Sequence, residues 1–260
     1  MARVPRPSKG ASSFLSPAGP RVFAHRGLAV DAPENTLLAF ARAIAADATY
    51  IETDVHASHD GVAVIAHDPD LKRVAGRNVK VSQLTMSELR RVDLGHGQSF
   101  CSLADALDTF PETRFNIDVK SAAAVAGTVR AITEANAVNR VLVSSFTEST
   151  RVAALRGLPG VVSSASARRF VVALLGGKVG FSPAVRRTLA GLVAVQVPER
   201  ALGMRITTKR MIDRLHAAGV EVHIWTVNDP KRMRELLELG VDGIVTDRVD
   251  LGIAVVRELS

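Results

Sequence analysis

The chain has 260 residues, a formal net charge of +7, and a composition that is 47% hydrophobic and 23% charged. This length and composition suit a globular α/β barrel, and no apolar run approaches the ~18 residues of a membrane span. Positive charge favours anionic partners. However, the Lys and Arg residues are scattered, and one Trp and one Tyr offer little for base stacking, so we do not expect nucleic-acid binding.

The first 20 residues and the single cysteine bear on where the protein works. Residues 1–20 are rich in Pro, Ser, Gly and Ala and contain no continuous apolar stretch, so we expect a flexible tail rather than a signal peptide. Cys101 cannot form an internal disulfide, which fits a reducing compartment. We therefore expect a cytoplasmic protein.

From residue 21 onward, short runs rich in β-branched residues alternate with helix-like segments. Asn35–Thr36 and Asp229–Pro230 are typical helix starts, and Gly219 and Gly240 lie where helices should end. Regular alternation predicts a parallel sheet, and eight repeats predict a (β/α)8 TIM barrel as a single domain over residues 21–260. The expected strands are 21–24, 50–55, 114–119, 140–145, 161–164, 192–197, 220–227 and 243–246. The expected helices are 36–46, 102–109, 122–135, 148–156, 168–175, 208–218, 230–239 and 251–258.

One stretch interrupts this alternation after the second strand. Asp60 and Gly61 predict a hairpin turn into a strand at 62–66, and a short helical pattern follows around 87–92. We expect a small insertion over about 58–100 that covers the carboxyl end of the barrel, because long loops after barrel strands usually carry function.

Acidic side chains gather where the expected strands end, which is the face of such barrels that carries active sites. Glu52 and Asp54 lie two residues apart on one strand and therefore point to the same face. Two carboxylates facing a barrel interior repel each other unless a cation lies between them, and Mg²⁺ or Ca²⁺ prefers oxygen ligands. Asp118, near the end of the neighbouring strand, is the natural third ligand. The alternative makes Glu52 an outward ion-pair partner and Asp54 a cap of a helix or loop.

Basic residues flank these carboxylates. His25 and His67 fall at strand ends, and histidine can take up or release a proton near neutral pH. Arg26 and Lys120 supply fixed positive charge for phosphoryl oxygens. A lone histidine is more often structural, but two histidines with three carboxylates at strand ends predict metal-dependent cleavage of a phosphodiester.

A series of short motifs runs in order through residues 21–248. The series is Ala-His-Arg-Gly at 24–27, Pro-Glu-Asn-Thr at 33–36 with Phe40, Ile-Glu-Thr-Asp-Val at 51–55, His-Asp at 67–68, Ser-Ser-Phe at 144–146, Trp-Thr-Val-Asn at 225–228 and Gly-Val-Asp-Gly-Ile-Val-Thr-Asp at 240–247. This ordered series resembles the glycerophosphodiester phosphodiesterase family.

The resemblance implies a barrel with a small insertion after strand two and cleavage of glycerophosphodiesters to glycerol 3-phosphate and an alcohol. It implies that His25 and His67 are the acid–base pair and that Glu52, Asp54 and the acid of strand three bind one Mg²⁺ or Ca²⁺. It also suggests that a glycerol hydroxyl of the substrate attacks first and that water opens the cyclic phosphate. The chain departs from the family by having Asp118 in place of the usual Glu, and Phe-Cys-Ser-Leu at 100–103 in place of Ile-Pro-Thr-Leu.

Further residues have a functional and a structural interpretation. Trp225 could form an apolar wall beside the substrate or fill the core. Glu34 could orient Arg26 or simply precede a helix, and Asp247 could support the site or serve the fold. Residues 168–187 carry Arg168, Arg169, Lys178, Arg186 and Arg187 around an apolar run and Phe181, which suits weak contact with an anionic membrane surface or an ordinary amphipathic helix.

Two other functions compete with the favoured one. Lysophospholipase D activity would use the same metal and histidines on lipids with one acyl chain. A non-catalytic barrel could bind phosphodiesters, although a binding protein needs no acid–base pair. The sequence does not predict the released alcohol or the oligomeric state.

Overall fold

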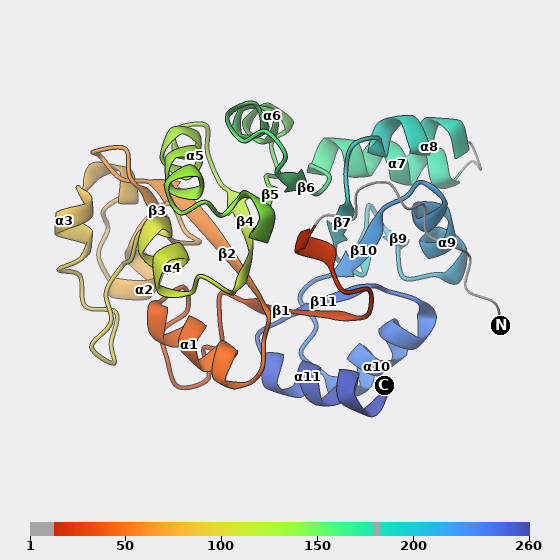
Figure 1. Ribbon diagram of the computed structural model, residues 1–260, viewed down its shortest axis with the longest axis horizontal. Coiled ribbons are helices and arrows are strands. Elements are labelled where there is room, and N and C mark those ends of the chain that lie inside the picture. Colours follow the sequence, from red (N-terminus) through yellow and green to blue (C-terminus); the bar gives the residue numbers. More distant parts are fainter. Residues whose placement is uncertain (1–12, 179–181) are drawn as a thin grey trace.

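The computed structural model describes residues 13–178 and 182–260, and its centre is a parallel β-barrel (Figure 1). The sheet order is β6-β5-β4-β2-β1-β11-β10-β7, and a parallel bridge between Ser164 and Ala194 joins the two ends. The predicted (β/α)8 barrel is confirmed. In the described part of the chain its eight strands are β1 (Arg21–His25), β2 (Tyr50–Ala57), β4 (Arg114–Val119), β5 (Val141–Ser144), β6 (Val162–Ser163), β7 (Ala194–Val197), β10 (Glu221–Ile224) and β11 (Gly243–Thr246).

Helices cover the outside of the barrel (Figure 1). Their starts and ends follow the sequence signals: Thr36 Oγ1 accepts a hydrogen bond from Ala39 N at 3.2 Å, Asp229 caps a helix with Pro230 in its first turn, and Gly240 ends that helix with φ of 105°. The helices are α1 (Leu37–Ala45), α4 (Leu103–Thr109), α5 (Ala124–Glu134), α6 (Glu148–Gly157), α7 (Ala167–Lys178), α8 (Ser182–Leu189), α9 (Lys209–Ala217), α10 (Pro230–Leu239) and α11 (Val249–Glu258).

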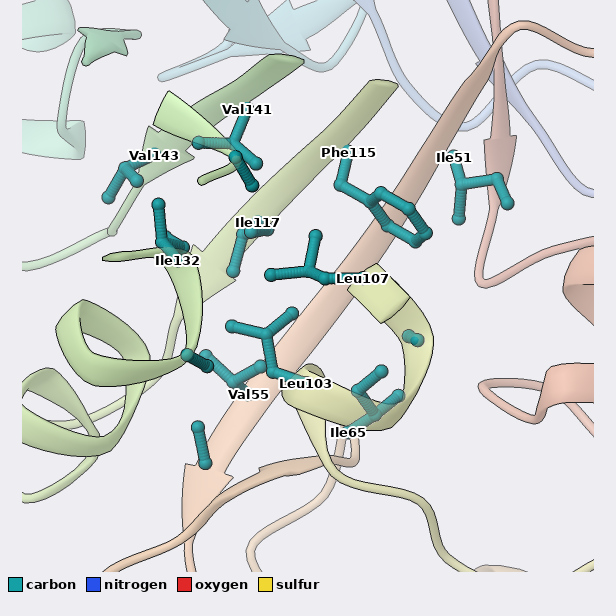
Figure 2. Close-up of a cluster of buried hydrophobic side chains, with 14 of the residues drawn as sticks. Ile51, Val55, Ile65, Leu103, Leu107, Phe115, Ile117, Ile132, Val141 and Val143 are labelled. Carbon is teal, nitrogen blue, oxygen red and sulfur yellow. The ribbon is translucent and has the colours of Figure 1, made fainter. Parts of the chain in front are cut away.

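Strand alternation separates the core from the interior of the barrel. Figure 2 shows Ile51 and Val55 of β2 packed with Phe115 and Ile117 of β4 against helix residues such as Leu107, and all five side chains are fully buried. Successive side chains on a strand point to opposite faces. The residues between these apolar positions therefore face the barrel interior, which places the acidic residues of β2 and β4 there.

The segment after β2 forms a small unit of its own beside the barrel. β3 (Ala63–Ile65) pairs antiparallel with β2 around a turn at Asp60 and Gly61, as expected. Ala66 N donates to Asp54 O at 3.0 Å, so the chain leaves β3 beside the carboxyl end of the barrel. Three short helices follow, and the apolar residues form a separate cluster. The helices are α2 (Lys72–Ala75), η2 (Val81–Gln83) and α3 (Met86–Leu89). The cluster is Val64, Ala66, Leu71, Val81, Met86, Leu89, Val92 and Phe100.

The N-terminal end of the barrel is closed by residues that the sequence assigns to a flexible tail. The short helix η1 (Ser13–Leu15) places Phe14 at 0% exposure, and Tyr50 Oη donates to Phe14 O at 2.8 Å. Arg21 donates to Leu15 O and Pro17 O at 2.5 and 3.1 Å and pairs with Glu221 at 2.8 Å. The tail prediction is therefore wrong for residues 13–20, and residues 1–12 lie outside the described part.

Several elements are absent from the sequence prediction. These are the helix α8, the hairpin of β8 (Arg200–Ala201) and β9 (Met204–Arg205), and the short helix η3 (Val138–Arg140). The α7 helix exposes Val172 and Leu175 and buries Phe170. Membrane contact through 168–187 stays a prediction, and Phe181 and the Lys178 side chain fall outside the described residues. Among described helices, none has the length and hydropathy needed to cross a bilayer.

Truncation of the core in Figure 2 is expected to destabilise the fold. Leu107→Ala removes a fully buried side chain and leaves a cavity, so we expect the free energy of unfolding to fall by about 2–5 kcal/mol in urea titrations. Leu175→Ala is the matched control because Leu175 is 50% exposed, and it should change stability by less than about 0.5 kcal/mol. Equal losses in the two variants would contradict this assignment of the core.

Candidate active site

The strand register brings the predicted site residues into two neighbouring rows. His25 at the end of β1 pairs with Glu52 of β2, and Glu52 pairs with Asn116 of β4. One step further along, Asp54 pairs with Asp118. All five residues therefore lie at the carboxyl ends of three adjacent strands, where parallel α/β barrels carry their active sites.

A lysine occupies the space between two of the carboxylates. Lys120 Nζ lies 2.7 Å from Asp54 Oδ1 and 2.7 Å from Asp118 Oδ2. Burial disfavours the charged ammonium, but the two carboxylates outweigh that effect and raise the pKa of Lys120 to about 12. The cation expected to face the substrate is thus engaged with the acidic residues in this structure.

Glu52, whose side chain is 12% exposed, has no comparable partner among the described residues. Burial, followed by repulsion from Asp54 and Asp118, raises the pKa of the Glu52 carboxyl well above its ordinary value. His25 Nε2 lies 3.9 Å from Glu52 Oε2. The Asp118 carboxyl also has a raised pKa, chiefly because it is buried. Lys120 therefore contacts two of the three acidic groups and leaves Glu52 without an ammonium partner.

Several oxygen atoms at this site are buried and unsatisfied. In the described part of the chain, Glu52 Oε2, Asp118 Oδ1 and Asn116 Oδ1 lack hydrogen-bond partners. Hard divalent cations bind such oxygen groups, so the donor set fits Mg²⁺ or Ca²⁺. As the side chains lie, however, no three His, Cys, Asp or Glu groups within residues 13–178 and 182–260 form a cluster that could hold a metal ion. Lys120 lies between Asp54 and Asp118 and is bonded to both.

Arg26 and its neighbours fix Asp54 from the side of β1. Arg26 Nε lies 3.4 Å from Asp54 Oδ2, and Arg26 Nη1 donates to Glu34 Oε1 at 3.0 Å. Asn35 Nδ2 donates to Asp54 Oδ2 at 3.3 Å, while its Oδ1 accepts from Thr53 Oγ1 at 2.8 Å. Arg26 and Asn35 both have positive φ values, 59° and 57°. This tight loop allows both side chains to reach one carboxylate.

His25 opens onto a cavity. Its Nδ1 lies 2.6 Å from Asp247 Oδ1, in the loop after β11. The cavity has a volume of about 480 Å³ and is lined by His25, Arg26, Ala29, Val30, Glu34, Asn228, Asp247 and Arg248. The hydrogen bond with His25 is the main cause that lowers the pKa of Asp247, so Asp247 is a carboxylate at neutral pH.

His67 opens onto a second cavity of about 210 Å³ on the side of β3 and α2. Its Nδ1 lies 2.7 Å from Asp68 Oδ1, and Arg73 Nε donates to Asp68 Oδ2 at 2.5 Å. Arg73 also pairs with Glu34 at 2.6 Å, and Glu34 lines both cavities. Burial alone would raise the pKa of Glu34, but Arg73 and Arg26 hold it below its ordinary value. Ion pairs thus connect the surroundings of both histidines.

Trp225 is connected to the site indirectly, because it contacts Phe146, which lies beside Lys120. It follows β10 and contacts Phe146, with ring centroids 6.4 Å apart at an interplanar angle of 63°. Phe146 is 61% exposed, and Lys120 Nζ lies 5.9 Å from the centre of its ring. The two aromatic rings therefore form an apolar border beside Lys120.

Sequence reasoning missed the supporting roles of Asn35, Arg73, Asn228 and Phe146. Asn35 and Asn228 belong to the short motifs, so the sequence marked both positions. It did not indicate which residues their side chains contact. Phe146 follows the end of β5 and could have been found by the strand-end rule that selected His25. Arg73 lies on the short helix α2, and its contacts depend on how the segment after β2 folds.

Comparison with known proteins decides the family. The sequence model described as the glycerophosphoryl diester phosphodiesterase family matches residues 25–251. The chain belongs to this family. It is therefore an enzyme, a phosphoric diester hydrolase, as the resemblance in the sequence implies. A protein of Mycobacterium tuberculosis named probable glycerophosphodiester phosphodiesterase 2 is 41% identical over 240 residues, covering 92% of this chain and 91% of that protein.

Solved structures support the fold. The crystal structure of a glycerophosphodiester phosphodiesterase from Agrobacterium tumefaciens has a TM-score of 0.73 and 26% identity, covering 91% of this chain and 98% of that chain. A phosphodiesterase of Oleispira antarctica, solved with its product sn-glycerol 3-phosphate, has a TM-score of 0.77 and 21% identity. The match covers 92% of this chain and 97% of the Oleispira antarctica chain.

Removing the charge of Glu52 is expected to stabilise the metal-free protein. A carboxyl whose pKa is raised on folding destabilises the folded state as the pH rises above its ordinary pKa of 4.5. Glu52→Gln should therefore increase the free energy of unfolding at pH 7 in EDTA, and the difference should shrink toward zero below pH 4.5.

The exposed Glu134 on α5 provides the matched control, because Glu134→Gln removes a solvated charge and should have little effect at either pH. Denaturant titrations at the two pH values measure all three proteins. A loss of stability in Glu52→Gln at pH 7 would contradict the buried, unpaired state of Glu52.

Proposed function

We propose that the chain hydrolyses glycerophosphodiesters to glycerol 3-phosphate and an alcohol at the carboxyl end of the barrel, with His25 and His67 as the acid–base pair and one divalent cation. Glycerophosphodiester phosphodiesterase activity follows from family membership. The observation that carries the finer proposal is that both histidines line cavities beside a buried group of carboxylates, and each is bonded to an aspartate through Nδ1.

Hydrogen bonding of Nδ1 leaves Nε2 of each ring free to transfer a proton. Cleavage of a phosphodiester needs one group to remove the proton of the attacking hydroxyl and another to protonate the leaving oxygen. His25 and His67 would divide these roles, since histidine changes its protonation near neutral pH. Arg26 and Lys120 would bind the phosphoryl oxygens, and Trp225 would border the substrate.

The carboxylates Glu52, Asp54 and Asp118 would hold one Mg²⁺ or Ca²⁺, with Glu34 supporting Arg26. Support comes from the buried oxygen atoms of Glu52 and Asp118 that have no partner among the described residues. A bound cation would polarise a phosphoryl oxygen and offset the charge that develops during cleavage. It would also offset the burial and the repulsion that raise the pKa of Glu52.

Release of glycerol 3-phosphate from glycerophosphocholine tests this proposal. We expect release with Mg²⁺ or Ca²⁺ and none after EDTA treatment. His25→Ala and His67→Ala should each lower kcat by about 10²–10⁴-fold, because each removes a proton-transfer group.

His59→Ala is the matched control, since His59 is exposed and lies on the turn between β2 and β3. It should keep wild-type activity. Metal-independent release, or full activity in either site variant, would refute the corresponding part of the proposal.

A second candidate function is hydrolysis of lysolipids with one acyl chain on the same site. The specific observation in its favour is Phe146, a large apolar side chain that is 61% exposed beside Lys120 and Trp225. An exposed aromatic residue at the entrance of a polar site would bind part of an acyl chain, whereas a short glycerophosphodiester would leave it in water.

Phe146→Ala separates these two substrates. If acyl chains bind there, kcat/KM for lysophosphatidylcholine below its micellar concentration should fall by roughly 10- to 100-fold, because burial of an aromatic side chain contributes about 1.5–3 kcal/mol. The value for glycerophosphocholine should change much less. Leu259→Ala on the C-terminal end, where Leu259 is 38% exposed, is the control. Equal effects on both substrates would argue against acyl-chain binding at Phe146.

A further inference from the structure

A carboxylate and an amide support His25 from two neighbouring strands. The sheet order β10-β11-β1 and the pairing of Ala24 with Thr246 place the residue after β11 beside His25. Asp247 Oδ1 lies 2.6 Å from His25 Nδ1, and Asn228 Nδ2 donates to Asp247 Oδ2 at 2.7 Å. Both oxygens of Asp247 are therefore engaged, one toward the histidine and one toward the amide.

Two hydrogen-bond donors, the backbone N–H of Asp247 and the hydroxyl of Thr246, set the orientation of the Asn228 amide. The backbone N–H of Asp247 donates to Asn228 Oδ1 at 2.9 Å. Thr246 Oγ1 accepts from Arg248 N at 3.0 Å and donates its own proton to Asn228 Oδ1 at 2.9 Å. Because the Asn228 amide oxygen accepts from these two donors, the amide nitrogen must point toward the side-chain carboxylate of Asp247.

The same reasoning extends to the ring of His25. An ionised carboxylate only accepts hydrogen bonds, so the proton of a neutral His25 ring must lie on Nδ1. Nε2 then carries the lone pair on the side of Glu52, whose Oε2 is 3.9 Å away. The chain Thr246–Asn228–Asp247 therefore determines both the tautomer and the direction of the ring.

Asp247 has no evident structural task that would explain this arrangement. Its side chain is 50% exposed, and Asn228 is also exposed, so neither belongs to the core. The equivalent partner of His67 differs: Asp68 is bonded to the cation Arg73, whereas Asp247 is bonded to a neutral amide.

We propose that Asp247 is a positioning residue for His25, held in place by Asn228, and that it keeps the imidazole in the Nδ1–H tautomer with Nε2 directed into the site. This inference rests on the proposed role of His25 in proton transfer.

Asp247→Asn tests the inference without changing the size of the side chain. We expect kcat for glycerophosphocholine with Mg²⁺ to fall roughly 10- to 100-fold with little change in KM, because a supporting hydrogen bond is lost and substrate contacts remain. ¹⁵N NMR of the imidazole, assigned by comparison with His25→Ala, should show the Nδ1–H tautomer in the wild type and its loss in the variant. Asp213→Asn on the exposed face of α9 is the matched control and should behave as wild type in both measurements.

Asn228→Ala provides a second variant in which the carboxylate remains but loses its donor. Asn228→Ala should also lower kcat, by a smaller factor than Asp247→Asn. The inference would be overturned if Asp247→Asn kept the wild-type kcat, changed KM alone, or kept the wild-type tautomer. If His25→Ala were inactive in the same assays, the proposed function would still stand. Full activity of His25→Ala would instead remove the proposed function itself. Circular dichroism of each variant verifies folding.

Discussion

Repulsion among buried carboxylates is the interaction around which the site is organised. Glu52, Asp54 and Asp118 face the barrel interior, and Lys120 neutralises only part of their charge. Arg26 and Asn35 add a cation and an amide donor to Asp54, but Glu52 keeps a raised pKa. Such an arrangement lowers stability and concentrates negative potential at the carboxyl end of the barrel, which is typical of functional sites.

The surroundings of the two histidines come from the two sides of β1 and differ in character. His25 depends on Asp247, which directly follows the barrel strand β11. His67 depends on Asp68 and Arg73, which belong to the segment with its own small core between β2 and α4. Glu34 links these two regions, because it pairs with both Arg26 and Arg73. A displacement of that segment would therefore change the position of one histidine relative to the other.

The sequence predicted the barrel and the grouping of acids because both follow from local periodicity. Alternation on β2 places Glu52 and Asp54 on one face, and the parallel register sets Asp118 beside them. Contacts that depend on unusual backbone or on distant docking were not predictable. Asn35 donates to Asp54 from a loop in which Asn35 itself has a positive φ value. Phe14 is fully buried, although it belongs to a segment whose composition suggests a flexible tail. The engagement of Lys120 with two carboxylates also needed the three-dimensional spacing.

The barrel is joined unevenly around its circumference. Among the described residues, an isolated bridge of Ser164 with Ala194 joins the backbones at β6 and β7, and Ser164 Oγ donates to Gln196 Oε1 at 3.2 Å. The two large apolar clusters lie on either side of the barrel. Each half thus has its own core, and the seam between them carries few backbone hydrogen bonds. Local opening requires the least free energy at such a boundary. New chain ends placed in the turn around residues 190–192 would coincide with this seam, which makes it the natural position for a circular permutation of the enzyme.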